Sequence, residues 1–333
     1  MKKNKKTVMV TGGAGYIGSH AVLACLDAGH KVIVIDKDKD ACDHLTKCLK
    51  RRKKLEVFNA DIDNDVYLDG IFSNQRVDAV IHCAAYICVP ESVENPLKYY
   101  ENNTAKSIKL LNKMRSHGVN KFVFASTAAV YGESKAGAAL TEKTPCKPIN
   151  AYGESKLMVE TVLKKHSKQN PIFRYASFRF FNVAGNDLGN RVQDIHWREK
   201  QNLVPKIMNI AIRQKGTLKI FGTDLPTHDG SCVRDYIHPS DLATAMLTAV
   251  EKDVHGVFNL GTKNGSSVWE IVKESVSVTQ TELDIEHAKP RPGDPHILIA
   301  DSTRFREETG WEPTYTTREM IETAYKAYRK VSK

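Results

Sequence analysis

The chain has 333 residues, a length typical of two domains or of one large α/β unit. Hydrophobic residues make up 41% of it, and their longest uncharged runs are far shorter than the roughly 18 residues of a membrane helix, which excludes a transmembrane protein. The net charge of +10 raises the question of nucleic acid, yet no aromatic side chains interleave with the basic run at 47–54 (KCLKRRKK), so we expect no nucleic-acid partner.

Neither a secretion signal nor a disulfide framework is expected from this sequence. The basic start (MKKNKK) precedes only a few apolar residues before a glycine turn. The seven cysteines form no C-x-x-C pair, and their spacing fits neither a zinc site nor a set of disulfides. We therefore expect reduced thiols, no bound metal and a cytoplasmic location.

In the first half of the chain, short apolar segments alternate with longer amphipathic ones. We predict strands at 7–11, 31–35, 55–58, 79–83, 121–126 and 175–180, with helical patterns such as 17–28, 96–117 and 152–167 between them. This alternation predicts an α/β protein with a Rossmann-type, doubly wound parallel sheet. After Phe181 the pattern becomes irregular, so we predict a cofactor domain at 1–181 and a smaller, mixed α/β substrate domain at 182–333, between which segments can cross.

A glycine-rich turn follows the first predicted strand and opens the first helix. Gly12 allows the tight turn, Gly15 lets the backbone approach a pyrophosphate, and Gly18 allows the helix to pack closely on the strand. The start of the helix adds free N–H groups and a positive dipole end, which favour phosphate. A plain turn is the alternative, but a strand before and a helix after are what a dinucleotide site requires.

Acidic residues after the next two strands complete this expected site. Asp36 ends the second strand, where a carboxylate binds the hydroxyls of the adenosine ribose and repels the extra phosphate of NADP. NAD is therefore the expected cofactor, although Lys37 beside Asp36 weakens that preference. Asp61 and Ile62 follow the third strand and are candidates to flank the adenine, with an ordinary strand-end Asp as the alternative.

A candidate catalytic group lies near the fifth strand. Tyr152 and Lys156 form a Y-x-x-x-K pattern at the head of a helix, and the spacing of four puts both side chains on one face. Thr127 lies at the end of the preceding strand. A tyrosine with a pKa near 10 is a poor base at neutral pH, and a neighbouring cation lowers that pKa. Alone this pattern is common on solvated helices; together with the glycine turn and Asp36 it predicts a catalytic site.

With these residues, the sequence resembles the extended short-chain dehydrogenase/reductase family and, within it, the UDP-glucose 4-epimerases. Matching segments include TGGAGYIGSH (11–20), NAYGESKLMVE (150–160), RFFNVAG (179–185) and, most specific, IFGTDLPTHDGSCVRDYIHPSDLA (220–243). The resemblance implies an isomerase that oxidises and reduces C4 of UDP-glucose or UDP-galactose with bound NAD. It also implies a homodimer formed through the helices at 96–117 and 152–167.

The resemblance assigns roles to individual residues. Tyr152 would remove the proton of the sugar O4, Thr127 would hydrogen-bond O4, and Lys156 would hold the nicotinamide ribose. Further expected cofactor contacts are Tyr16, Ile17, Ala84, Ala85, Asn102 and Phe180. Expected contacts of the UDP-sugar are Phe181, Asn182, Asn202, Leu203, Phe221, Arg234, Arg291, Asp294 and Leu298. Without the family, ordinary surface charge is the better interpretation of Arg234, Arg291 and Asp294.

Two positions depart from the family pattern. Ile87 stands in the turn after the fourth strand, where the family often has a Lys, and this predicts weaker retention of NAD. Leu298 stands where members restricted to glucose and galactose tend to carry Tyr, whereas members that accept N-acetylated sugars carry smaller residues. We therefore predict some activity on UDP-N-acetylglucosamine.

Alternative functions remain open at this point. A 4,6-dehydratase needs an Asp-Glu pair directly after the strand-end Ser or Thr, where this chain has Ala128 and Ala129. A non-catalytic dinucleotide-binding sensor typically loses the catalytic Tyr or Lys, and this chain keeps both. An epimerase of UDP-N-acetylglucosamine remains the nearest alternative.

Overall fold

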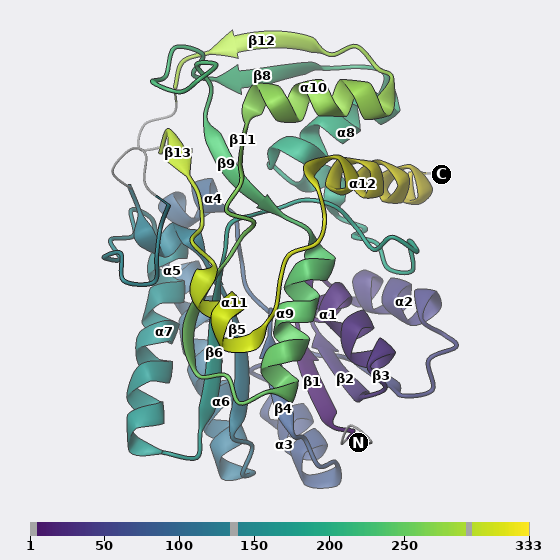
Figure 1. The fold of residues 1–333 in the computed structure, drawn as a ribbon. Coiled ribbons are helices and arrows are strands. Elements are labelled where there is room, and N and C mark those ends of the chain that lie inside the picture. The colour runs from purple at the N-terminus through teal and green to yellow at the C-terminus, as the bar shows by residue number, and fades with distance from the viewer. Residues whose placement is uncertain (1–4, 134–138, 291–294, 333) are drawn as a thin grey trace.

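A seven-stranded parallel sheet with helices on both faces forms the larger part of the computed structural model, which describes residues 5–133, 139–290 and 295–332 (Figure 1). The strand order is β3-β2-β1-β4-β5-β6-β10. The first six strands are β1 (Thr7–Thr11), β2 (Lys31–Asp36), β3 (Leu55–Asn59), β4 (Ala79–His82), β5 (Lys121–Thr127) and β6 (Arg174–Phe180). The predicted Rossmann-type sheet is confirmed, and each predicted strand agrees with the structure to within about one residue at its ends.

The alternation of side chains along each strand explains why both faces are covered. In β1, Val8 and Val10 belong to one hydrophobic cluster, whereas Met9 belongs to the other. Helices α1 (Tyr16–Asp27) and α2 (Lys39–Cys48) pack on the first cluster. The second cluster is covered by α3 (Asp65–Asn74), α6 (Lys106–Ser116) and α7 (Ala151–Gln169). Strands buried on both faces are typical of parallel sheets, whose carboxyl ends then share one edge.

The second half of the chain completes this larger body. Strand β10 (Gly256–Leu260) pairs with β6 as the seventh strand, and α9 (Pro239–Glu251) packs against α1 on the first face. Helix α11 (Thr303–Thr309) adds Phe305 to the same hydrophobic cluster. Segments from beyond residue 181 thus lie within the larger body, and a division of the chain at residues 181 and 182 stays a prediction.

A smaller body stands above the carboxyl ends of the sheet strands in Figure 1. Its helices are α8 (Leu203–Arg213), α10 (Val268–Thr279) and α12 (Thr317–Val331), which pack around a hydrophobic cluster that includes Trp197, Met208 and Ile321. Its strands are β7 (Asn182–Val183), β8 (Thr217–Phe221), β9 (Val233–Ile237), β11 (Gly265–Ser267), β12 (Asp284–Ala288) and β13 (Ile297–Leu298). The mixed α/β composition predicted for this part is observed.

The helix predicted at 96–117 is not a regular α-helix throughout. It consists of α5 (Pro96–Tyr99), a π-helical segment at Tyr100–Ala105 and then α6, and α4 (Val89–Glu94) precedes it. The wider turn carries Asn102 and Asn103, and the Asn103 side chain is buried. Its amide oxygen accepts from the backbone N of Tyr86 at 2.8 Å, and its amide nitrogen donates to the Tyr86 carbonyl at 3.0 Å. The π segment therefore fixes the loop that follows β4, as π-bulges at functional sites often do.

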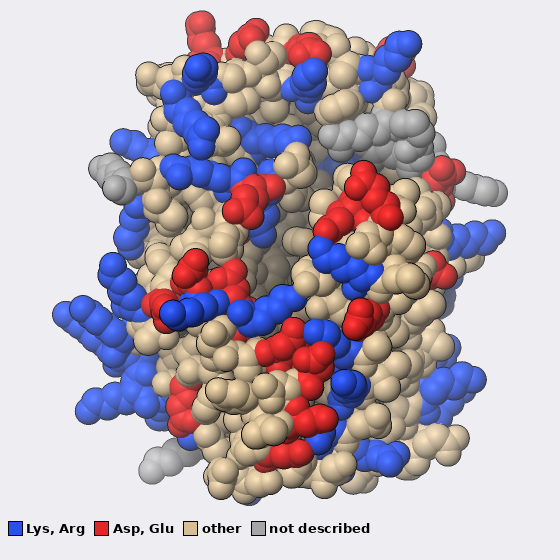
Figure 2. Space-filling view, turned by 180° about the vertical axis from the view of Figure 1, so that it is seen from behind, with Lys and Arg blue, Asp and Glu red and all other residues tan. Residues whose placement is uncertain are grey.

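Charge is mixed over the surface. On the face drawn in Figure 2, Lys and Arg side chains are interspersed with Asp and Glu rather than gathered into one continuous basic patch. Within the described residues, no helix combines the length and apolar character that crossing a membrane requires. The same residues contain no group of three or more His, Cys, Asp or Glu side chains placed to hold a metal ion.

Candidate functional site

The turn between β1 and α1 depends on glycine for two different reasons. Gly12 has a φ of 65°, and a Cβ there would lie 2.5 Å from the backbone N of Ala84. A Cβ on Gly18 would lie 2.0 Å from the carbonyl oxygen of Gly12. A Cβ on Gly15, by contrast, would meet protein atoms no closer than 3.4 Å. Gly12 and Gly18 are thus required by the packing of the chain, whereas Gly15 leaves open the space into which a ligand can come.

Asp36 lies beside this turn at the end of β2. Its carboxylate accepts from the backbone N of Ala14 at 3.0 Å and from the backbone N of Asp38 at 3.1 Å. Burial raises the pKa of Asp36, and these backbone hydrogen bonds act against that rise. Asp61, at the next strand end, forms an ion pair with Lys106 at 2.7 Å. Burial alone would raise the pKa of Asp61, but the hydrogen bond and charge of Lys106 outweigh it, so that the pKa is lowered.

These residues line one cavity of about 320 Å³. Every cofactor contact predicted from the first four strands lies in its wall: Gly12, Gly15, Tyr16, Ile17, Gly18, Asp36, Asp61, Ile62, Ala84, Ala85 and Asn102. Lys37 also lines the cavity, but its ammonium donates to the hydroxyl of Tyr86 at 2.6 Å. Ile87 is more than half exposed at the rim.

The candidate catalytic residues come together at the carboxyl end of β5. Thr127 ends that strand, and Tyr152 lies in the first turn of α7, whose N-cap Asn150 accepts from the backbone N of Gly153 at 2.9 Å. A Cβ on Gly153 would lie 2.6 Å from the carbonyl oxygen of Ala129, so this glycine lets α7 begin directly against the segment that follows Thr127. The Thr127 and Tyr152 side chains are hydrogen-bonded to each other.

Burial dominates the electrostatics of this group. It raises the pKa of Tyr152, and the hydrogen bond with Thr127 lowers that pKa in part. Burial lowers the pKa of Lys156 to about 8, against the influence of Cys83 and Glu160. The Lys156 ammonium donates to the carbonyl oxygen of Ala125 at 2.8 Å. The role of Lys156 in lowering the pKa of Tyr152 stays a prediction for the cofactor-bound enzyme.

A second cavity, of about 570 Å³, contains the catalytic group. Its wall includes Thr127, Tyr152 and Lys156 together with the predicted contacts Phe180, Phe181, Asn182, Asn202, Arg234 and Leu298. Arg234 lies in β9 directly opposite Leu298 in β13, and its guanidinium donates to the Val233 carbonyl at 2.9 Å. The two cavities adjoin, since seven residues line both: Tyr16, Ile17, Cys83, Ala85, Ile87, Asp194 and Lys200.

Four predicted substrate contacts lie elsewhere or outside the described residues. Leu203 begins α8 and packs against the hydrophobic cluster of the smaller body. Phe221 ends β8 and does not line either cavity. Arg291 and Asp294 fall within 291–294, which lies outside the residues that the structure describes. The roles assigned to these four residues stay predictions.

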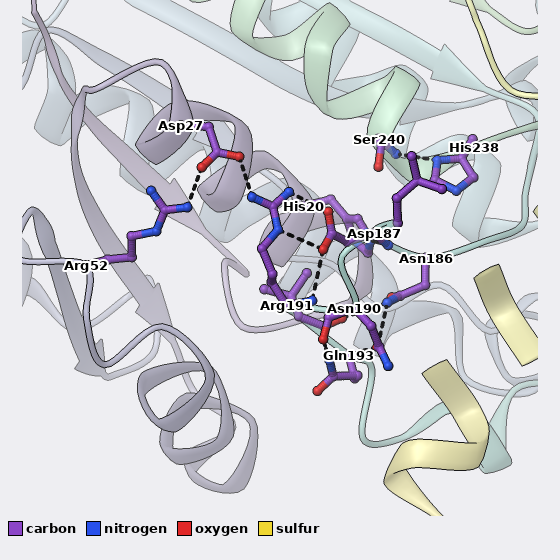
Figure 3. A network of polar contacts seen from close by, with 12 residues as sticks. His20, Asp27, Arg52, Asn186, Asp187, Asn190, Arg191, Gln193, His238 and Ser240 are labelled. Atoms are coloured by element: carbon purple, nitrogen blue, oxygen red, sulfur yellow. Dashed lines mark hydrogen bonds and ion pairs between the residues drawn. The ribbon is translucent and has the colours of Figure 1, made fainter. Parts of the chain in front are cut away.

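One segment of the site, at 186–200, was not predicted from the sequence; we call it the strap. Asp194, Ile195, His196 and Lys200 of the strap line the first cavity. Figure 3 shows how its first part is held: Arg191 pairs with Asp27 of α1 at 2.8 Å and with Asp187 at 2.6 Å. The strap has no helical or strand periodicity, and the one feature that could have revealed it is the spaced apolar side chains of Val192, Ile195 and Trp197, which are buried or packed on the cores of the two bodies.

The first cavity fits a dinucleotide. Gly15 leaves room where a pyrophosphate comes close, no side chain caps the first turn of α1, and Asp36 faces the cavity at the end of β2. Asp61 and Ile62 line the same cavity, and Lys156 and Phe180 line the adjoining one. The residues therefore suit NAD, and the contact predicted for each of them stays a prediction.

Comparisons with known proteins agree with this geometry. Residues 8–261 match the NAD dependent epimerase/dehydratase family. The UDP-glucose 4-epimerase of Halalkalibacterium halodurans is 42% identical over 330 residues, which cover 97% of this chain and 96% of that protein. The UDP-glucose 4-epimerase of Lactobacillus helveticus is 39% identical, with 97% of both chains covered.

Solved structures give the same picture. A UDP-glucose 4-epimerase from Stenotrophomonas maltophila with bound NAD and formylated UDP-arabinopyranose has a TM-score of 0.92 and 31% identity, and covers 98% of this chain and 99% of its own. The UDP-Glc/GlcNAc 4-epimerase of Campylobacter jejuni has a TM-score of 0.86 and 35% identity, with 98% of this chain and 99% of that chain covered.

Proposed function

Because the chain belongs to the NAD dependent epimerase/dehydratase family, we propose that it is an isomerase that interconverts UDP-glucose and UDP-galactose with bound NAD. The observation that carries this proposal is that the cavity of Thr127, Tyr152 and Lys156 adjoins the dinucleotide cavity. A UDP-sugar in the second cavity therefore lies next to a nicotinamide that extends from the first. A sensor that binds dinucleotides without catalysis has no use for such an arrangement.

The chain's own residues handle the proton at O4 of the sugar. Bound NAD supplies the acceptor and donor of hydride at C4. Tyr152 takes the proton from O4 and later returns it, and Thr127 holds O4 by a hydrogen bond. Tyr152 must itself lose a proton first, and its raised pKa opposes this. We assign Lys156 the task of lowering that pKa, since its positive charge lies one helical turn from Tyr152.

Incubation of the purified protein with UDP-galactose, without added NAD, tests this proposal. We expect UDP-glucose as the product, formed with the NAD that stays bound through purification. Tyr152→Phe is the matched control, since it removes one oxygen from the buried side chain. We expect this variant to fold and to bind NAD while turnover falls by at least roughly 10²-fold. NAD binding without any product from the wild type would instead favour the sensor, and near wild-type turnover of Tyr152→Phe would refute the assignment of the base.

UDP-N-acetylglucosamine is a second candidate substrate. Leu298 lines the second cavity beside Phe181, and a Leu leaves more room near the sugar C2 substituent than a Tyr at this position would. The similar enzyme of Campylobacter jejuni is named for both kinds of sugar. We propose a dual activity in which the plain hexoses remain the main substrates.

A homodimer and a cytoplasmic location complete the proposal. Large apolar side chains are exposed on the mutually packed helices α4, α5, α6 and α7, namely Val93, Leu97, Ile108 and Met158, and Leu97 is 75% exposed. Such side chains on adjoining helices support a dimer through this surface, which light scattering after gel filtration tests by mass. The seven cysteines are unpaired in the structure, which supports a reducing compartment.

A further inference from the structure

Lys200 occupies a special place between the two cavities. Among the described residues that line both of them, it is the one with a basic side chain. Its ammonium lies 5.4 Å from the ring centre of Tyr16, the first residue of α1. The Lys200 side chain is 22% exposed, and it forms an ion pair of 3.1 Å with Asp194, whose side chain is 6% exposed. A strap lysine thus lies over the ring of the first residue of the helix that opens the dinucleotide site.

The strap is anchored just before this lysine in the chain. His196 contacts the carboxylate of Asp38, the N-cap of α2, at 2.7 Å. Trp197 stacks on Tyr328 of α12 with ring centres 4.3 Å apart. Lys200 is therefore carried by a segment that is anchored to both bodies, so that its position does not depend on the ion pair with Asp194 alone.

The opposite wall offers hydrogen-bond donors, and its one described lysine, Lys37, is directed at Tyr86. Gly15 caps α1 without a side-chain hydrogen bond, so the first amides of the helix point at open space. The described basic side chains in the wall of the first cavity are Lys37, Lys200 and His196, of which Lys37 donates to Tyr86 and His196 faces Asp38. A diphosphate against the helix start carries two negative charges, and Lys200 is the cation placed to face it.

We propose that Lys200 binds the diphosphate of the dinucleotide from the strap side, opposite the first amides of α1, and so retains the cofactor. This inference rests on the proposed NAD-dependent function and deepens it. Asp194 holds the ammonium in place when the site is empty and shares it when the diphosphate is bound. The diphosphate of the UDP-sugar has the same chemistry, but Ile195 and His196, which shortly precede Lys200 in the strap, line the first cavity and not the second.

The test measures release of NAD from the holoenzyme by exchange against labelled NAD. We expect Lys200→Met to release NAD about tenfold faster, the usual effect of losing one hydrogen bond to a charged group, and Lys200→Arg to stay close to wild type. Asp194→Asn breaks the ion pair but keeps the ammonium, so it should release NAD no faster than wild type. Lys113→Met is the matched control, because Lys113 is 24% exposed, pairs with Asp69 at 2.7 Å and lies away from both cavities.

A parallel titration of the same holoenzymes with UDP distinguishes the two diphosphates. Weaker UDP binding by Lys200→Met with unchanged release of NAD would assign the lysine to the substrate and overturn the proposal. Equal acceleration by Asp194→Asn would show that the ion pair merely holds the strap, and unchanged release by Lys200→Met would show that no contact exists. None of these readouts requires turnover, so failure of the epimerase assay is a separate result.

Discussion

Lys156 is the residue at which function and stability oppose each other. It is 3% exposed, and its ammonium contacts a backbone carbonyl and the face of the Phe124 ring, which offset only part of the loss of water. Its pKa of about 8 lies below the value of 10.5 for a lysine in an unfolded chain. The folded state therefore disfavours the charged form of Lys156. We interpret this free-energy cost as the consequence of placing a cation one helical turn from Tyr152.

Lys156→Met should stabilise the protein at neutral pH while it abolishes turnover. A shift of the Lys156 pKa from 10.5 to about 8 destabilises the folded wild type by on the order of 3 kcal/mol at neutral pH. The variant also loses the hydrogen bond to Ala125, which reduces its gain in stability by about 1 kcal/mol. We expect the cofactor-free variant to gain about 1–2 kcal/mol in urea unfolding at pH 7.

The pH dependence of this gain has a defined sign. Below about pH 8 the ammonium is charged in both states, so the wild type bears the full cost. Between about pH 8 and 10.5 the unfolded chain binds more protons than the folded one, and the stability of the wild type rises with pH. The advantage of Lys156→Met should therefore shrink as the pH approaches 10.5. An advantage that is constant over this range would contradict the argument, as would a less stable variant at pH 7.

At the scale of elements, the unit from β1 through its glycine turn into α1 was predictable because its information is local. Residues 7–28 contain a strand pattern, three spaced glycines and a helix pattern. Every cofactor contact predicted within this range lines the first cavity. The helix at 96–117 was predicted less well. Its π segment depends on Asn103, which pairs with Tyr86 in a distant loop, and no local pattern records that contact.

The glycine turn yields a prediction that separates packing from binding. Gly15→Ala should leave the unfolding free energy within about 0.5 kcal/mol, because Gly15 has ordinary backbone angles and a Cβ would approach protein only to 3.4 Å. The same methyl group should weaken NAD binding by roughly 10-fold or more, since it enters the space of the pyrophosphate.

Gly18→Ala is the matched comparison for this turn. Its Cβ would lie 2.0 Å from the Gly12 carbonyl, so we expect a loss of at least about 1–3 kcal/mol of stability. Thermal unfolding without cofactor and titration with NAD measure the two effects separately. Equal destabilisation by both substitutions would remove the distinction drawn between these glycines.

At the scale of the whole molecule, the site lies where the two bodies meet, and here sequence reasoning was weakest. Contacts between segments far apart in the chain determine three features that were not predicted: the strap, the packing of Leu203 in the smaller core and the position of Phe221. The sequence motifs predicted the candidate catalytic residues. Which other side chains line the cavities depends on tertiary packing, and the motifs do not record that packing.

The wall that Leu298 forms is a product of this assembly. Strand β13 brings Leu298 against a cluster of Ala128, Val130, Tyr131, Leu140, Phe181 and Ala300. We expect detectable epimerisation of UDP-N-acetylglucosamine by the wild type, and Leu298→Tyr should reduce it by roughly 10- to 100-fold relative to UDP-glucose, because overpacking costs about 1–3 kcal/mol. Leu298→Phe separates bulk from the added hydroxyl. If neither substitution changes the ratio of activity on UDP-N-acetylglucosamine to activity on UDP-glucose, this wall does not select the sugar.

Strand β10 also bears on how the chain is made on the ribosome. Phe180, at the end of β6, is translated long before Gly256, where β10 begins, and until then β6 has an open edge and α1 lacks its partner α9. A nascent chain that ends near residue 181 should therefore remain sensitive to proteases and need protection by chaperones. Limited proteolysis of stalled nascent chains of increasing length tests this, and resistance acquired before β10 emerges would contradict it. In this protein the seven-stranded sheet, most of whose strands are translated first, is then among the last parts of the molecule to be finished.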